Sequence, residues 1–203
     1  MRKNLFYIAT SLLILLGFAP LQSQVFPVKV DRKWGLIDNT GNLLTIPSYQ
    51  AIHRIPGNHA IIVQNNLYGL LNSRGKVIIP AKYTFLRELS HDLILLNKGG
   101  DCQDGDCEGG KWGIAHLPSQ TLIEPRFDFI GPFDAFGFAK VNIGGDCDYV
   151  DCEGGVWGLL DSLGRLRIPV AYQSLIYNGV DEALIESEAG WGLFDLVQDT
   201  VTI

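Results

Sequence analysis

The feature that most constrains the fold is an internal repeat built around an aromatic residue followed by glycine. The pair occurs at Trp34-Gly35, Tyr68-Gly69, Trp112-Gly113, Trp157-Gly158 and Trp191-Gly192, at spacings of 34, 44, 45 and 34 residues. In four units a second aromatic follows fifteen positions after the first, at Tyr49, Tyr83, Phe127 and Tyr172, with a proline two or three residues before it. Such a repeat predicts an array of similar units that share one continuous core.

Each unit is typical of a β-hairpin followed by a third strand. The stretch WGLIDNTGNLLTIP contains an apolar strand, a short polar turn with glycine, and a second apolar strand that ends at proline. Third strands are predicted at 60–64, 93–97, 138–143 and 183–187, with a counterpart at 27–30 ahead of the first tryptophan. No window of eleven or more residues after residue 23 has convincing helical spacing. The sequence therefore predicts an all-β protein.

The strands WGLID and YGLLN are apolar on both alternating faces, which predicts that neighbouring units cover them on two sides. We expect the recurring aromatics to lie in this core. The pattern favours tandem β-hairpin repeats stacked as an open, solenoid-like array, and a propeller-like closed ring is the alternative. We expect a single domain over 24–203, with units near 27–59, 60–92, 93–137, 138–182 and a partial unit at 183–203.

The units KWGLIDNTGNLLTIPSYQAI, LYGLLNSRGKVIIPAKYTFL and VWGLLDSLGRLRIPVAYQSL resemble the WG-repeat family of bacterial β-repeat proteins. The resemblance covers essentially the whole chain after residue 23. It implies an all-β repeat structure, often in exported or cell-surface proteins, and it implies no common catalytic activity or active-site residues. The chain departs from the pattern in the third unit, around IAHLPSQTLIEP, and in the fifth, which stops at Ile203 before the expected proline.

The first 23 residues have the form of a secretory signal peptide. MRKN is basic, and LFYIATSLLILLGFAP is an apolar run. We predict cleavage after Ser23, with Gln22 and Gln24 as other possible sites and an uncleaved anchor as the alternative. No later run approaches the roughly 18 apolar residues of a membrane helix. We therefore expect an exported protein, in the periplasm, on the cell surface or outside the cell, with no membrane span after signal removal.

Two similar segments, GGDCQDGDCEGG at 99–110 and GGDCDYVDCEGG at 144–155, are inserted ahead of the third and fourth tryptophans. Each is typical of a projecting hairpin, because turn-forming residues separate its two cysteines. We predict the disulfides Cys102–Cys107 and Cys147–Cys152. The alternatives are disulfides between the two hairpins, or a zinc site with four thiolate ligands.

Acidic residues concentrate in the same insertions. The formal charge of −6 becomes −8 without Arg2 and Lys3, and each insertion carries −4, so the rest of the chain is neutral. The sequence favours a solvated, self-repelling loop, with a calcium site as the alternative. The carboxylates that coincide between the two insertions are Asp101, Asp106 and Glu108 in the first and Asp146, Asp151 and Glu153 in the second. Since no basic stripe is present, nucleic acid is not an expected partner.

Histidines show no catalytic pattern. His53, His59, His91 and His116 do not recur in register, and none lies in a recognisable catalytic motif. We expect no enzyme, no catalytic residue and no cofactor. We expect instead an interaction module of the cell envelope that binds a protein or a glycan. The alternatives are a structural envelope protein, a calcium-binding surface module and, less favoured, an unrecognised hydrolase.

Overall fold

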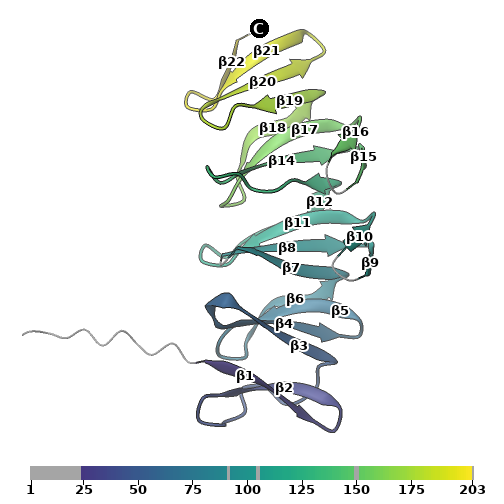
Figure 1. The fold of residues 1–203 in the computed structure, drawn as a ribbon, viewed down its shortest axis with the longest axis vertical. Coiled ribbons are helices and arrows are strands. Elements are labelled where there is room, and N and C mark those ends of the chain that lie inside the picture. The colour runs from purple at the N-terminus through teal and green to yellow at the C-terminus, as the bar shows by residue number, and fades with distance from the viewer. Residues whose placement is uncertain (1–23, 91, 104–105, 149–150, 203) are drawn as a thin grey trace, which may run out of the picture.

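The computed structural model describes residues 24–90, 92–103, 106–148 and 151–202, and the predicted signal peptide at 1–23 lies outside this part. In the described residues, five antiparallel β-sheets stack along one axis, with the first and last at opposite ends, and two small two-stranded sheets project from the stack (Figure 1). This arrangement confirms the all-β, open repeat array and excludes the closed ring. Within the described ranges, no helix is long and apolar enough to cross a membrane.

Of the five stacked sheets, the first has two strands and the other four are four-stranded meanders. The first sheet pairs β1 (Val25–Val30) with β2 (Lys33–Asp38), and β-bridges join Trp34 to Tyr49 and Ile37 to Leu43. The second contains β3 (Ala51–Ile55), β4 (His59–Gln64), β5 (Leu67–Leu71) and β6 (Val77–Tyr83), with the 3-10 turn η1 (Pro56–Asn58) after β3.

The third and fourth sheets each carry an inserted two-stranded hairpin. The third contains β7 (Phe85–Ser90), β8 (Leu93–Lys98), β11 (Lys111–His116) and β12 (Thr121–Phe127), and its hairpin is β9 (Asp101–Gln103) with β10 (Asp106–Glu108). The fourth contains β13 (Phe129–Ile130), β14 (Phe138–Ile143), β17 (Val156–Asp161) and β18 (Leu166–Tyr172), and its hairpin is β15 (Asp146–Cys147) with β16 (Cys152–Glu153). The fifth contains β19 (Ser174–Tyr177), β20 (Glu182–Ser187), β21 (Gly190–Asp195) and β22 (Thr200–Thr202).

The structure adds, to each of the four-stranded sheets, one strand that the sequence pattern did not predict. These strands are β3, β7, β13 and β19, and each begins within two residues of the second aromatic of the preceding unit. They pair antiparallel with the predicted third strands. Segments such as AIHRI mix polar and apolar residues without strict alternation, so tertiary pairing and not local pattern defines them.

A side-chain hydrogen-bond acceptor closes the turn after each strand that carries the aromatic-glycine pair. The carboxylate oxygen Oδ1 of Asp38 accepts hydrogen bonds from the Thr40 and Asn42 backbone N–H groups, both at 2.9 Å. Hydrogen bonds from the Thr40 hydroxyl and the Asn42 N–H lower the pKa of Asp38 to about 2. Asn72 and Asp161 make equivalent pairs of bonds, and Asp195 accepts from the N–H groups of Val197 and Gln198. His116 takes this place in the third unit, where the Ser119 N–H donates to Nδ1.

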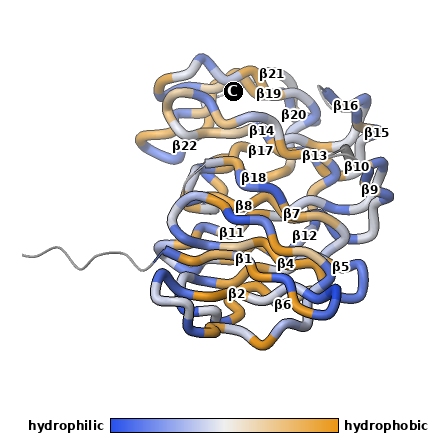
Figure 2. Tube along the Cα trace, turned by 60° about the horizontal axis from the view of Figure 1, so that its bottom comes forward, coloured by the Kyte–Doolittle hydropathy of each residue, from blue (hydrophilic) through white to orange (hydrophobic). Residues whose placement is uncertain are grey.

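Four hydrophobic layers lie between the five sheets, and alternate residues of one strand pack into different layers. Along β8, Ile94 and Leu96 pack in the layer toward the second sheet, whereas Leu93 and Leu95 pack in the layer toward the fourth. Figure 2 shows the apolar strands lying in successive levels. This arrangement explains why the strands are apolar on both faces.

The aromatic residue of an aromatic-glycine pair, here called the WG aromatic, projects toward the next sheet along the stack. Trp34, Tyr68, Trp112 and Trp157 pack against the four successive layers. Of the second aromatics, Tyr49, Tyr83 and Phe127 are buried and Tyr172 is half-buried. Trp191 differs, because it belongs to the last sheet, which has no described sheet above it.

The glycine of the repeated pair permits a close approach of the backbone. A Cβ atom on Gly69 would lie 2.7 Å from the Ile79 carbonyl oxygen on the neighbouring strand. Gly35, Gly113 and Gly158 have equivalent backbone neighbours. The second position of the motif is therefore glycine for a steric reason.

Candidate functional site

The two inserted hairpins lie on the same side of the stack, one above the other (Figure 1). In each, the cysteines face one another across the hairpin, and disulfides join Cys102 to Cys107 and Cys147 to Cys152. No cysteine of the chain is left as a free thiol. Neither the alternative disulfides between the hairpins nor the four-thiolate zinc site forms.

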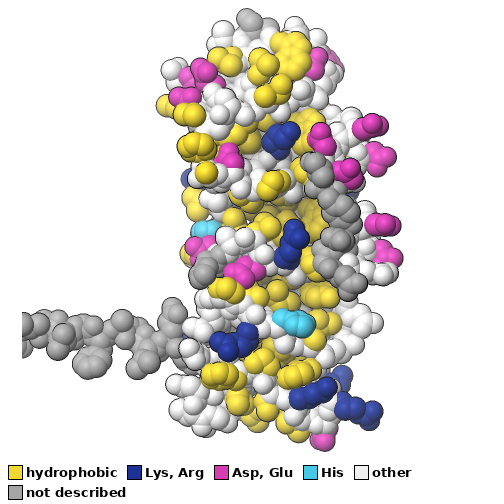
Figure 3. All heavy atoms as spheres, in the orientation of Figure 1, with side chains coloured by type: hydrophobic (Ala, Val, Ile, Leu, Met, Phe, Trp, Pro, Cys, Tyr) yellow, Lys and Arg dark blue, Asp and Glu magenta, His cyan; other side chains and the backbone are white. Residues whose placement is uncertain are grey.

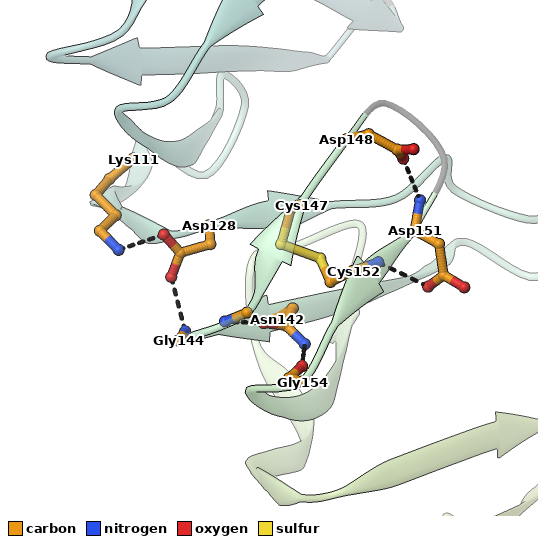
Figure 4. The surroundings of a disulfide bond; sticks show 10 residues. Lys111, Asp128, Asn142, Gly144, Cys147, Asp148, Asp151, Cys152 and Gly154 are labelled. Atoms are coloured by element: carbon orange, nitrogen blue, oxygen red, sulfur yellow. Dashed lines mark hydrogen bonds and ion pairs between the residues drawn. A yellow bond between two sulfur atoms is a disulfide. The ribbon is translucent and has the colours of Figure 1, made fainter.

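A buried asparagine holds the base of each hairpin. Asn142 is 0% exposed, its Oδ1 accepts a hydrogen bond from the Gly145 N–H at 3.0 Å, and its Nδ2 donates to the Gly154 carbonyl at 3.1 Å (Figure 4). Asn97 makes the same two contacts, with Gly100 and Gly109. The side-chain amide therefore joins the two arms at the point where the hairpin leaves the sheet.

Sequence reasoning missed both asparagines, although a signal was present. The similarity between the insertions begins three residues before the second glycine, as Asn-Lys-Gly-Gly-Asp-Cys and Asn-Ile-Gly-Gly-Asp-Cys. An asparagine at the end of an apolar strand, at the same place in both copies, indicates a side chain that satisfies buried backbone groups.

Asp128 connects the start of β11, which directly follows the first insertion, to the second insertion. It forms an ion pair with Lys111, at the start of β11, and its Oδ2 accepts a hydrogen bond from the Gly144 N–H at 2.8 Å (Figure 4). Burial raises the pKa of the Asp128 carboxyl, but the bond from Gly144 and the Lys111 ammonium outweigh this effect, and the pKa is lowered. The charged carboxylate therefore sets the second hairpin relative to the third sheet.

A cleft of about 520 Å³ lies between the two hairpins. Its apolar lining includes Leu95, Trp112, Phe129 and Ile130. Four carboxylates and one basic side chain also line it, namely Glu108, Asp128, Asp146, Asp148 and Arg87. Figure 3 shows acidic side chains gathered on the side of the stack that carries the hairpins. The cleft thus combines an apolar surface with negative charge.

The predicted calcium ligands do not converge in the described part of the chain. Asp101 lies opposite Glu108 across the first hairpin, and Asp146 lies opposite Glu153 across the second. Asp151 accepts a hydrogen bond from the Cys152 N–H, and the Asp106 side chain lies outside the described atoms. Among the described side chains, no group of three or more His, Cys, Asp or Glu could hold a metal ion.

The histidines lie apart from this cleft. His59 and His116 line a second cleft, of about 510 Å³, between the second and third sheets. Burial lowers the pKa of His59, and its Nδ1 is buried without a hydrogen-bond partner among the described atoms. His53 lies in β3, and His91 is outside the described residues. The described histidines form no catalytic constellation with the hairpin cleft.

Removing one disulfide is expected to have a moderate effect on stability. The variant Cys102→Ser/Cys107→Ser should lower the free energy of unfolding by about 2 kcal/mol, because the bridge closes only a short loop in the unfolded chain. Urea denaturation of the variant and the parent measures this difference. The corresponding variant of Cys147 and Cys152 is the matched comparison. A loss large enough to abolish folding would contradict a purely local role.

Comparisons with known proteins agree with the repeat pattern. The sequence model of the family described as WG containing repeat matches residues 34–68, 68–101 and 112–146, which together span half of the chain. No curated protein sequence matches. A solved structure titled "Crystal structure of the eukaryotic initiation factor" aligns with 89% of this chain and 84% of its own at 10% identity. Its TM-score is 0.32, too low for any inference about fold or function.

Proposed function

The chain belongs to the family of WG containing repeat proteins, and on that premise we propose that it is a non-enzymatic interaction module that binds a partner polypeptide outside the cytoplasm. The stacked sheets supply an extended rigid scaffold, as in other repeat proteins that present binding surfaces. Two disulfides in one small domain are typical of oxidising compartments, which supports export.

The observation that carries the proposal is the cleft between the hairpins. Both walls include a disulfide cysteine, Cys107 on one side and Cys147 on the other. Asp128 fixes the base of one wall relative to the other through Lys111 and Gly144. A binding site held in this way loses little conformational entropy when a partner enters, which favours affinity.

The composition of the cleft indicates the chemistry of the partner. Carboxylates of Glu108, Asp146 and Asp148 attract cations, while the half-buried Trp112 offers apolar and aromatic surface. A lysine or arginine side chain matches both features, because an aliphatic stem carries its charged head. We therefore propose that the cleft binds a polypeptide segment in which basic and apolar side chains alternate.

Binding of a defined peptide tests the proposal. A fluorescein-labelled dodecapeptide of alternating lysine and valine should bind the purified protein and raise its fluorescence anisotropy, whereas the glutamate-valine peptide should not. The double variant Glu108→Gln/Asp146→Asn should weaken binding about tenfold, because it removes two charges that line the cleft.

The control variant is Asp101→Asn/Glu153→Gln. It removes the same charge from the same two hairpins, at the positions opposite Glu108 and Asp146, but neither residue lines the cleft. Affinity close to that of the parent is expected. Equal weakening by both variants would show diffuse charge attraction in place of a site, and absence of binding by the parent would overturn the proposed peptide chemistry.

A further inference from the structure

The outer face of the fifth sheet is apolar and uncovered in the described structure. Strand register places Ile176 beside Leu184 and Leu184 beside Leu193 on this face. These side chains are 58%, 40% and 40% exposed, and Trp191 on the same face is 47% exposed. Figure 3 shows hydrophobic side chains at this end of the stack. End repeats of soluble arrays normally present a polar outer face, so an apolar end indicates a docking surface.

The internal interfaces show what covers such a face. Trp157 occupies in the fourth sheet the position of Trp191 in the fifth, and it is only 7% exposed because the fifth sheet packs against it. At all four interfaces, the face with the WG aromatic is covered by the opposite face of the following sheet. The C-terminal face therefore matches a second WG sheet that docks through its own face without the WG aromatic.

The first sheet presents a face of that kind. Val25 and Leu36 point into the first hydrophobic layer, so the register places Val28, Val30 and Ile37 on the outer side. Leu43 bridges Ile37 and is 60% exposed, and Val30 is 48% exposed. The two ends of the stack therefore carry the two complementary halves of an internal interface.

The charges of the two ends favour contact between a C-terminal face and an N-terminal face (head-to-tail) over contact between two C-terminal faces (tail-to-tail). The segment 174–202, which forms the fifth sheet, contains six carboxylates and no lysine or arginine. The segment 25–49, which forms the first sheet, has three basic and two acidic residues. Figure 3 shows Lys and Arg side chains near the N-terminal end. Two C-terminal ends repel one another, whereas a C-terminal and an N-terminal end attract.

We propose that the C-terminal face of one molecule docks on the N-terminal face of a second copy, so that the sheet stack continues from molecule to molecule. The contact is heterologous, and it generates linear oligomers because the two ends of the open stack point in opposite directions (Figure 1). This assembly uses neither hairpin and is independent of the cleft.

Sedimentation of variants blocked at one end tests the proposal. The C-terminal variant is Leu184→Thr/Leu193→Thr and the N-terminal variant is Val30→Thr/Leu43→Thr, all at exposed positions that accept a strand-compatible polar residue. The parent should form larger species as concentration rises. Each variant alone should remain a monomer, and an equimolar mixture of the two should form dimers, since each supplies the face that the other lacks.

The control variant Val77→Thr/Leu122→Thr makes the same chemical change at exposed positions of β6 and β12, away from both ends, and should associate as the parent does. Circular dichroism checks that every variant is folded. A parent that stays monomeric overturns the proposal. So does an N-terminal variant that still dimerises by itself, which would demonstrate tail-to-tail contact. Weaker association at high salt is expected, because the attraction between the ends is screened.

Discussion

Replacement of Trp157 by alanine is expected to lower the free energy of unfolding by about 3 to 5 kcal/mol. The indole is 7% exposed in the layer between the fourth and fifth sheets. Its ring packs edge-on against Phe129, with centroids 6.0 Å apart, and the Lys140 ammonium lies 4.6 Å from the ring centroid. Removing it leaves a cavity between two sheets that cannot both move inward. Urea denaturation measures the difference.

Trp191→Ala is the matched control, because it changes the same position of the repeat in a sheet that only one other described sheet covers. Trp191 is 47% exposed, so its loss should cost about 1 kcal/mol or less at protein concentrations where the chain is monomeric. Equal losses for the two variants would show that the motif position itself, and not the covering sheet, determines the contribution of the tryptophan.

Gly155→Ala is expected to lower the free energy of unfolding by about 2 to 4 kcal/mol. Gly155 has φ +70°, and a Cβ there would lie 2.5 Å from Asn142 Oδ1 and 2.7 Å from the Ile143 carbonyl oxygen. The left-handed conformation alone costs an alanine about 1 to 2 kcal/mol, and the crowding adds about as much again. The methyl group also displaces the amide that closes the hairpin, which should lower peptide affinity of the cleft.

Gly154→Ala separates these two causes. Gly154 has the same φ of +70°, but a Cβ would meet no atom within 4 Å. The backbone cost alone then applies, about 1 to 2 kcal/mol. Thermal or urea unfolding of both variants gives the comparison. If Gly154→Ala destabilises as much as Gly155→Ala, backbone strain and not the contact with Asn142 explains the requirement for glycine.

Features that depend on residues close together in the sequence can be predicted without the structure. Trp-Gly, the turn residues and the Ile-Pro strand lie within one unit, so their spacing predicts strands and turns directly. The disulfides join cysteines five positions apart, and a hairpin between them brings the sulfurs together without help from the rest of the chain. Double-faced apolar strands require cover on two sides, so the pattern predicted stacked sheets and favoured an open array, while the structure was needed to exclude a closed ring.

Other features were hidden because they arise between units. β3 and its counterparts pair only with a strand that follows them, and their own composition carries little signal. Asn97 and Asn142 recur at the same place in the sequence, but that both arms of a hairpin bond to one side-chain amide is visible only in the structure. Asp128 lies between two strands, and its contacts with Lys111 and Gly144 join parts of the chain that no local pattern relates.

The sequence by itself determined the repeat, its hairpin strands and its turns, and it favoured the local cysteine pairs, because each depends on interactions over a few residues. Only the tertiary structure decided what each repeated residue does. Stacking buries Trp157 and leaves Trp191 exposed, although the two occupy the same motif position. Stacking also places two distant insertions side by side to form a cleft. Identical local sequence thus acquires different roles, because burial and charge depend on which sheet lies next to it.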